Sequence, residues 1–283
     1  MGNKKRSKVE YYSNLMIKKS IPEQLYIMMF SVIEFKELII RFLRRDITVR
    51  YKQSILGLLW VFIIPVISIL FFVVLNKSGV MNLEKVNIPY PLYAIVGITC
   101  WQLFSNSLMY SINALVGAGG MIAKINFPKS TLIFAAIGRA FVEFLIRCVM
   151  IIAVAMYYQY IPSWKIIFVP LVIISLILFS TALGFLFSIL NCIFRDIGNV
   201  IQLIMTFCMF VTPVLYPIKK GALQILNQYN PLNYFINGIR DLAFGLNTVP
   251  ISSVMIVCGL SVLLFIILWR LFIIVEPRIA ERI

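Results

Sequence analysis

The sequence contains no histidine, and only 13% of its 283 residues are charged. Histidine is the commonest general base and metal ligand, so its absence removes that chemistry. The 11 acidic residues are scattered along the chain and form no cluster of carboxylates suited to acid–base catalysis. A membrane-embedded glycosyl- or acyltransferase would need such groups, so we expect that the chain is not an enzyme.

A phosphate-binding loop is missing as well. Such a loop ends in Gly-Lys-Ser/Thr, and Gly117, Gly119 and Gly120 lack a lysine at that spacing. We interpret these three glycines as a turn. The five cysteines have neither paired nor metal-ligand spacing, which favours buried thiols over disulfides. We therefore expect no cofactor or metal to be bound by this chain.

Apolar residues make up 61% of the sequence, far above the balance of a water-soluble domain. The length allows about six helices of roughly 20 residues, each crossing about 30 Å of hydrocarbon. The formal net charge is +15, with the basic residues concentrated before the first apolar stretch. Anionic lipid headgroups are the nearest partner for such a segment. We expect contact with membrane lipids and no nucleic-acid partner.

The chain divides into three predicted parts, which together make an all-α membrane protein. Residues 1–30 form a polar, basic tail. Residues 31–57 form an amphipathic helix whose apolar side chains recur every three or four positions, and its arginines place it at the membrane interface. Residues 58–283 form a transmembrane domain of six helices.

The six predicted spans lie at about 58–75, 91–115, 131–158, 166–190, between Asp196 and Lys219, and at 251–274. The fifth is predicted to end at the proline pair Pro213 and Pro217. Residues 221–250 are too apolar for an open loop and are interrupted too often for a span. We predict one or two short re-entrant helices there, with an interfacial loop as the alternative. We counted lysine and arginine in the segments on each side of the predicted membrane, and Arg240 falls in an external segment. These residues are more frequent on the side of the amino terminus. This bias predicts that both termini are cytoplasmic.

Several motifs resemble a known family. Residues 45–57 (RDITVRYKQSILG), followed by Trp60 and Pro65, resemble the approach to the first span in permeases of ABC-2 type exporters for O-antigen, capsule and teichoic acid. Residues 125–129, 194–197 and 230–240 are further points of similarity. The resemblance covers the chain from about Glu34 to its end and leaves out the first 30 residues.

The resemblance implies a homodimer that works with two separate ABC ATPase subunits, which would bind ATP and Mg²⁺. Such a complex sits in the bacterial inner membrane and exports a polysaccharide carried on undecaprenyl diphosphate. The same fold could instead export teichoic acid, capsule, a drug or another lipid.

Four groups of residues are candidates for function. A gate for the lipid diphosphate would comprise Arg45, Asp46, Arg50, Tyr51 and Lys52, because guanidinium groups donate paired hydrogen bonds to phosphate. Snorkelling of these side chains toward headgroups is the alternative. The resemblance implies coupling to the ATPase through Lys124, Ile125, Asn126, Phe127, Pro128 and Lys129, which could otherwise form a plain turn.

The third group is Arg139, Glu143 and Arg147, which a helix stacks on one face at intervals of four residues. We expect these charges to pair with one another, with direct contact to saccharide or phosphate as the alternative. The fourth group contains aromatic residues that could line a channel or simply pack: Tyr90, Tyr93, Trp101, Phe104, Phe207, Phe210, Tyr216, Tyr234 and Phe235.

Overall fold

The computed structural model describes residues 21–52, 57–77, 88–122, 124–125, 127–217 and 222–279. The regular elements of these residues are all helices, which confirms the predicted all-α class. In chain order they are α2 (Ile21–Glu34), α3 (Lys36–Lys52), the 3-10 turn η1 (Gly57–Leu59), α4 (Trp60–Lys77), α5 (Tyr90–Gly117), α6 (Gly119–Ile122), α7 (Ser130–Tyr157), η2 (Trp164–Phe168), α8 (Val169–Ile193), α9 (Ile197–Val211), α10 (Ala222–Tyr229), α11 (Pro231–Phe244) and α12 (Ile251–Ile279).

Four segments of the described chain are long and apolar enough to cross a membrane: Tyr90–Gly117, Ser130–Tyr157, Trp164–Ile193 and Ile251–Pro277. The first and fifth predicted spans correspond to shorter apolar helical segments, Trp60–Phe71 and Ile197–Val211. The α9 helix ends at Val211, just before the proline pair Pro213 and Pro217 where the fifth span was predicted to end, because Pro213 disfavours helical backbone at the residue before it. Thr212 is accordingly extended. Six spans remain a prediction.

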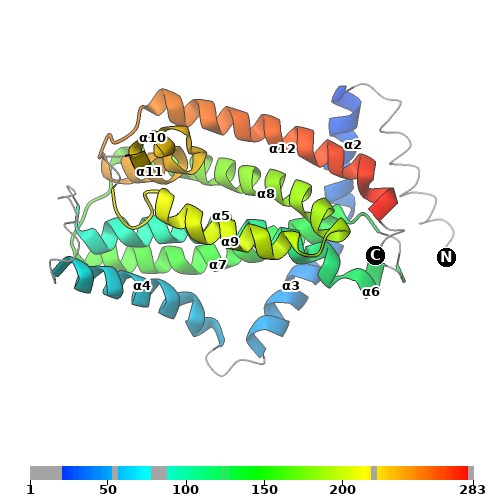
Figure 1. The fold of residues 1–283 in the computed structure, drawn as a ribbon, viewed down its shortest axis with the longest axis horizontal. Coiled ribbons are helices and arrows are strands. Elements are labelled where there is room, and N and C mark those ends of the chain that lie inside the picture. The colour runs from blue at the N-terminus through cyan, green and yellow to red at the C-terminus, as the bar shows by residue number, and fades with distance from the viewer. Residues whose placement is uncertain are drawn as a thin grey trace.

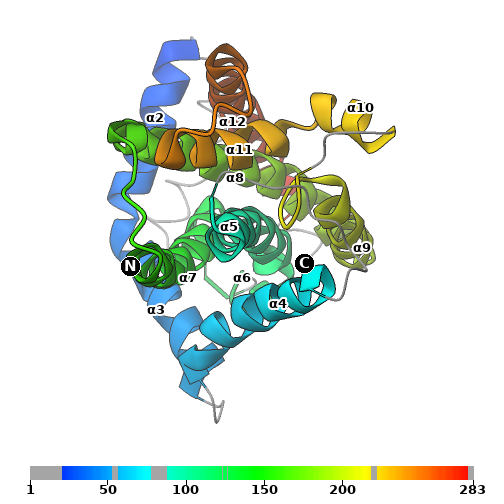
Figure 2. The same ribbon diagram turned by 90° about the vertical axis from the view of Figure 1, so that its left-hand side faces the viewer.

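Helix α5 forms the centre of the bundle. Figure 2 shows it surrounded by α4, α7, α8 and α9, with α12 packed on the outer side of α8. Small residues allow close helix contacts: a Cβ atom built on Gly184 of α8 would lie 2.6 Å from the Cβ of Ser111 in α5. The main apolar core therefore lies around α5 and α8.

Residues 31–57, predicted as one amphipathic helix, belong to two helices, α2 and α3, separated at Phe35, and to the start of η1; residues 53–56 lie outside the described part. Helix α2 begins at Ile21, so ten residues assigned to the polar tail are helical. Met28 of this helix is buried in the apolar cluster that also contains Phe42. Residues 1–20 lie outside the described part. Figure 1 shows α2 and α3 crossing the bundle transversely near the end of α12.

The opposite end of the bundle carries the short helices α10 and α11 (Figure 1). Both lie within residues 221–250, where short helices were predicted. Helix α11 starts where the Asn230 side chain accepts a hydrogen bond from the Leu232 backbone N–H at 3.0 Å, a typical helix cap. It ends at Gly245, whose φ of 71° is the left-handed conformation that glycine adopts readily. Their depth in the membrane remains a prediction.

Candidate functional site

The carboxyl-terminal half of α3 carries the predicted gate residues. Arg45 pairs with its neighbour Asp46, with Nη2 at 2.8 Å from Oδ1. The Arg45 guanidinium also lies 5.2 Å from the centroid of the Phe42 ring, and its Nη1 is 3.9 Å from Sδ of Met121 in α6. The Arg45 side chain is still 45% exposed. It is thus held in place but remains accessible to a ligand.

Arg50 connects α3 to the centre of the bundle. Its Nη1 donates a 2.8 Å hydrogen bond to the Tyr110 hydroxyl of α5, and its guanidinium lies 5.6 Å from the Tyr110 ring centroid. Lys52 is exposed, and the side chain of Tyr51 lies outside the described part. The gate residues therefore include a direct link to a core helix.

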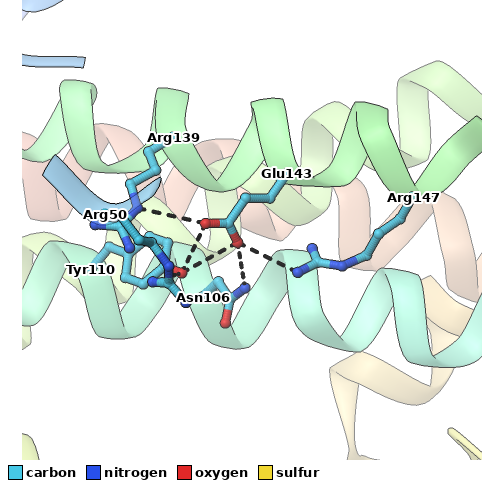
Figure 3. A network of polar contacts seen from close by, with 6 residues as sticks. All are labelled: Arg50, Asn106, Tyr110, Arg139, Glu143 and Arg147. Atoms are coloured by element: carbon cyan, nitrogen blue, oxygen red, sulfur yellow. Dashed lines mark hydrogen bonds and ion pairs between the residues drawn. The ribbon is translucent and has the colours of Figure 1, made fainter. Parts of the chain in front are cut away.

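The Tyr110 hydroxyl belongs to a buried charge network centred on Glu143 (Figure 3). The hydroxyl lies 3.1 and 3.2 Å from the two Glu143 carboxylate oxygens, and the Asn106 amide donates to Oε2 at 3.0 Å. Arg139 Nε is 3.6 Å from Oε1, and Arg147 Nη2 is 3.4 Å from Oε2. The predicted pairing of Arg139, Glu143 and Arg147 is confirmed.

Among the residues that the structure describes, the network contains more arginines than carboxylates. Arg139 and Arg147 contact one carboxylate, and Arg50 reaches the same group through Tyr110. Glu143 is only 2% exposed and Arg147 only 5% exposed. Charged groups at membrane depth are expensive and usually face protein or water, so this concentration of arginines makes the region attractive to an anion.

A recess of about 430 Å³ opens beside the network and joins two of the predicted groups. We call it the gate pocket. It is lined from α3, α5, α7 and α9 by Arg45, Asp46, Met109, Tyr110, Asn113, Ala114, Gly117, Ala136, Arg139 and Gln202. Arg45 and Arg139 face the same space although they are distant in sequence. Two arginine forks can together grip a group with several phosphate oxygens.

The predicted coupling segment is turned partly inward. Lys124 and Ile125 are exposed, whereas Phe127 and Lys129 are buried; Asn126 lies outside the described part. The Phe127 ring lies 5.5 Å from the Phe42 ring of α3. The Lys129 backbone N–H donates to Glu276 Oε1 of α12 at 2.7 Å, and Lys129 Nζ is 3.6 Å from that oxygen. This segment therefore connects α3 with the carboxyl end of α12.

The nine predicted channel aromatics fall into different environments. Four are buried inside the subunit, where packing accounts for them: Tyr93, Trp101, Phe104 and Phe235. Tyr90, Tyr216 and Tyr234 are partly exposed. Phe207 and Phe210 are 64% and 52% exposed on α9, so this pair remains available for a channel surface.

The family model for ABC-2 type transporters matches residues 37–244, which is more than half of the chain. The chain belongs to the ABC-2 type transporter family. The match begins in α3 and ends with α11, so it includes the gate pocket and the Glu143 network. Family membership and the four apolar helices together identify a multi-pass membrane protein of a transport family.

Two relatives are similar to most of the chain. The O-antigen export system permease protein RfbA of Myxococcus xanthus is 26% identical over 253 residues, covering 88% of this chain and 95% of that protein. The protein of the same name from Klebsiella pneumoniae is 29% identical over 210 residues, covering 73% of this chain and 80% of the relative.

This ABC-2 family member also contains a buried arginine, Arg240, in a segment that was predicted to be external. Arg240 of α11 is 0% exposed. Its Nη1 donates to the Pro213 carbonyl at 2.6 Å, and its Nη2 donates to the carbonyls of Val214 at 2.6 Å and Tyr93 at 2.9 Å. Its guanidinium also lies 3.5 Å from the Tyr93 ring centroid. We call this set of contacts the Arg240 clasp.

The Arg240 clasp holds the chain after α9 against the first turn of α5. A Cβ atom on Gly97 would collide with Arg240 Nη2 and with the Val214 carbonyl oxygen, so glycine provides the space for the guanidinium. At the other end of α9, Asn191 accepts from the Gly198 N–H at 2.9 Å and donates to the Ile112 carbonyl at 3.1 Å. Neither contact set follows from the spacing of residues along one helix, so sequence reasoning missed both.

Proposed function

We propose that the chain is the membrane-spanning subunit of an ATP-driven exporter that moves a polysaccharide linked to undecaprenyl diphosphate out of the cytoplasm. The arginine-lined gate pocket carries the proposal, because it joins the interfacial helix α3 to the core of an ABC-2 type chain. A lipid diphosphate is anionic at one end and apolar along its tail. It would approach from the headgroup layer, where α3 is expected to lie.

The pocket suits the phosphate end of such a lipid. Arg45 comes from α3 and Arg139 from α7, while Ala114, Gly117 and Ala136 are small side chains that leave room between them. Its volume of about 430 Å³ falls within the range of ordinary ligand pockets. Each guanidinium can donate two hydrogen bonds to phosphate oxygens, which a lysine ammonium does less specifically.

The proposed complex contains two copies of this chain with six spans each, both termini in the cytoplasm, and two ATPase subunits that bind ATP and Mg²⁺. The absence of a Gly-Lys-Ser/Thr loop from the sequence supports a separate ATPase. The exposed side chains of Lys124 and Ile125 would meet the ATPase, and the buried part of the segment, Phe127 and Lys129, would transmit its motion to α3 and α12.

The cargo is the part of the proposal that depends on relatives. Their printed name, O-antigen export system permease, favours an O-antigen-like polysaccharide in the inner membrane of a bacterium. Teichoic acid, capsule, a drug or another lipid would use the same fold.

Export can be tested in cells that lack this chain and are complemented with variants. We expect the double variant Arg45→Gln/Arg139→Gln to lose surface polysaccharide and to accumulate lipid-linked polymer on the cytoplasmic side. Arg41→Gln is a matched control, because Arg41 is an exposed arginine of α3 that does not line the gate pocket. For every variant, we measure how much of the chain is present in the membrane and how much of it co-purifies with the ATPase. Normal export by the double variant would show that the pocket does not receive the cargo.

A further inference from the structure

Tyr110 stands at the junction between the gate pocket and the Glu143 network. Its side chain lines the pocket, its hydroxyl contacts both Glu143 oxygens, and the same hydroxyl receives the hydrogen bond from Arg50 at 2.8 Å. Arg139 lies 4.0 Å from the centroid of the Tyr110 ring. Figure 3 shows the Tyr110 side chain of α5 between Arg50 of α3 and Glu143 of α7. The same side chain borders the space where a ligand would sit.

The direction of these hydrogen bonds follows from the chemistry of the groups. A guanidinium can only donate, and a phenol has a single hydrogen to donate. The Tyr110 hydrogen therefore points to Glu143, and its oxygen lone pair faces Arg50. Glu143 orients the hydroxyl so that it accepts from Arg50. In the contact that joins α3 to α5, the charged Arg50 guanidinium donates to the neutral Tyr110 hydroxyl.

A phosphate in the pocket would offer Arg50 a better acceptor. Either acceptor bonds to a charged guanidinium, but a phosphate adds attraction between opposite charges and can accept two parallel hydrogen bonds from one arginine. The pocket already contains Arg45, which lies on α3 only five positions before Arg50. An anion beside Tyr110 therefore competes with the phenol oxygen for the Arg50 guanidinium.

We propose that Tyr110 is a latch that holds Arg50, and with it the end of α3, in the resting position until an anionic phosphate ligand replaces its hydroxyl as the acceptor for Arg50. This inference rests on the proposed function for the nature of the cargo. Tyr110 is a positioning residue in this scheme, because it keeps Arg50 away from the ligand and does not itself hold the phosphate.

The latch has a measurable consequence that is opposite to that of an ordinary binding residue. Removing the Tyr110 hydroxyl removes the acceptor that competes with the ligand for Arg50. Arg50 then no longer has to leave Tyr110 before it binds the ligand, so the apparent affinity for the ligand rises. We expect Tyr110→Phe, which keeps the ring beside Arg139, to bind inorganic pyrophosphate roughly tenfold more tightly, given the usual strength of a hydrogen bond to a charged group. Arg50→Gln should bind more weakly.

The experiment measures the Kd of radiolabelled pyrophosphate for the purified chain in nanodiscs of uncharged phosphatidylcholine, which removes competition from anionic lipids. The double variant Tyr110→Phe/Arg50→Gln completes a thermodynamic cycle, and in it the gain from Tyr110→Phe should vanish. Tyr160→Phe is the control. Its hydroxyl bonds to the Phe244 carbonyl at 3.2 Å, away from the pocket, so its Kd should equal that of the wild type.

The outcomes separate the latch from the proposed function. Tighter binding by Tyr110→Phe that depends on Arg50 supports the latch. Unchanged or weaker binding by Tyr110→Phe, or a gain that persists in the double variant, overturns the latch and leaves the gate pocket standing. If the wild type does not bind pyrophosphate, or if Arg139→Gln does not weaken that binding, both the latch and the gate pocket are overturned. Faster amide hydrogen exchange in the last turn of α3 in unliganded Tyr110→Phe is a second expected sign of release.

Discussion

Replacing Arg240 with methionine tests whether the Arg240 clasp stabilises the end of the bundle that carries α10 and α11. The substitution keeps a long side chain but removes the donors that satisfy the carbonyls of Pro213, Val214 and Tyr93. These carbonyls would then be buried without the hydrogen bonds that Arg240 donates to them. Measured hydrogen bonds between membrane helices average about 0.6 kcal/mol, so three of them set a lower bound of about 2 kcal/mol. Leaving one buried acceptor without a donor in a soluble protein costs about 1–3 kcal/mol.

We therefore expect Arg240→Met to lower the free energy of unfolding by about 2–5 kcal/mol. The assay is denaturant-induced unfolding in mixed micelles, followed by circular dichroism. Arg270→Met is the matched control, because Arg270 is an exposed arginine of α12 and its loss should change stability by about 0.5 kcal/mol or less. Equal stability of the two variants would refute the reasoning and would mean that the clasp contributes no net free energy.

Three further predictions use the same unfolding assay. Lys129→Met leaves the Glu276 carboxylate buried without its cation, and we expect a loss of about 3–5 kcal/mol that Glu276→Gln partly restores; no restoration would contradict the pairing. Gly184→Ala places a methyl group 2.6 Å from the Cβ of Ser111 and should cost about 1–3 kcal/mol, with Ser111→Gly as the compensating change. Asn191→Ala removes the bonds that hold the start of α9 and should cost about 1–3 kcal/mol, so an unchanged stability would exclude that role.

The long apolar helices were predictable because hydrophobicity is a property of contiguous residues. The predicted span at 91–115 became α5 (Tyr90–Gly117), and the span at 131–158 became α7 (Ser130–Tyr157). The end of α9 at Val211 was predictable as well, because the proline pair Pro213 and Pro217 marks it in the sequence. The start of α2 at Ile21 was missed because the basic tail before it obscured a short apolar helix.

Part of the candidate site was also visible in the sequence. Arg139, Glu143 and Arg147 could be paired in advance because residues four apart meet on one helix whatever surrounds it. The arginines of α3 could be recognised from their position before an apolar stretch. Their roles as gate residues remain predictions, as does coupling through Lys124 and Ile125.

The sequence by itself determined that this is a helical membrane chain with charges stacked along one of its helices, because both properties depend on neighbours within a few residues. The tertiary structure alone decided that Arg50 reaches Tyr110, that Arg45 and Arg139 share a pocket, and that Arg240 is buried against three carbonyls. These contacts join helices that are distant in the chain. They depend on how each helix is rotated and how closely it crosses its neighbours, and small residues such as Gly97 and Gly184 control that approach.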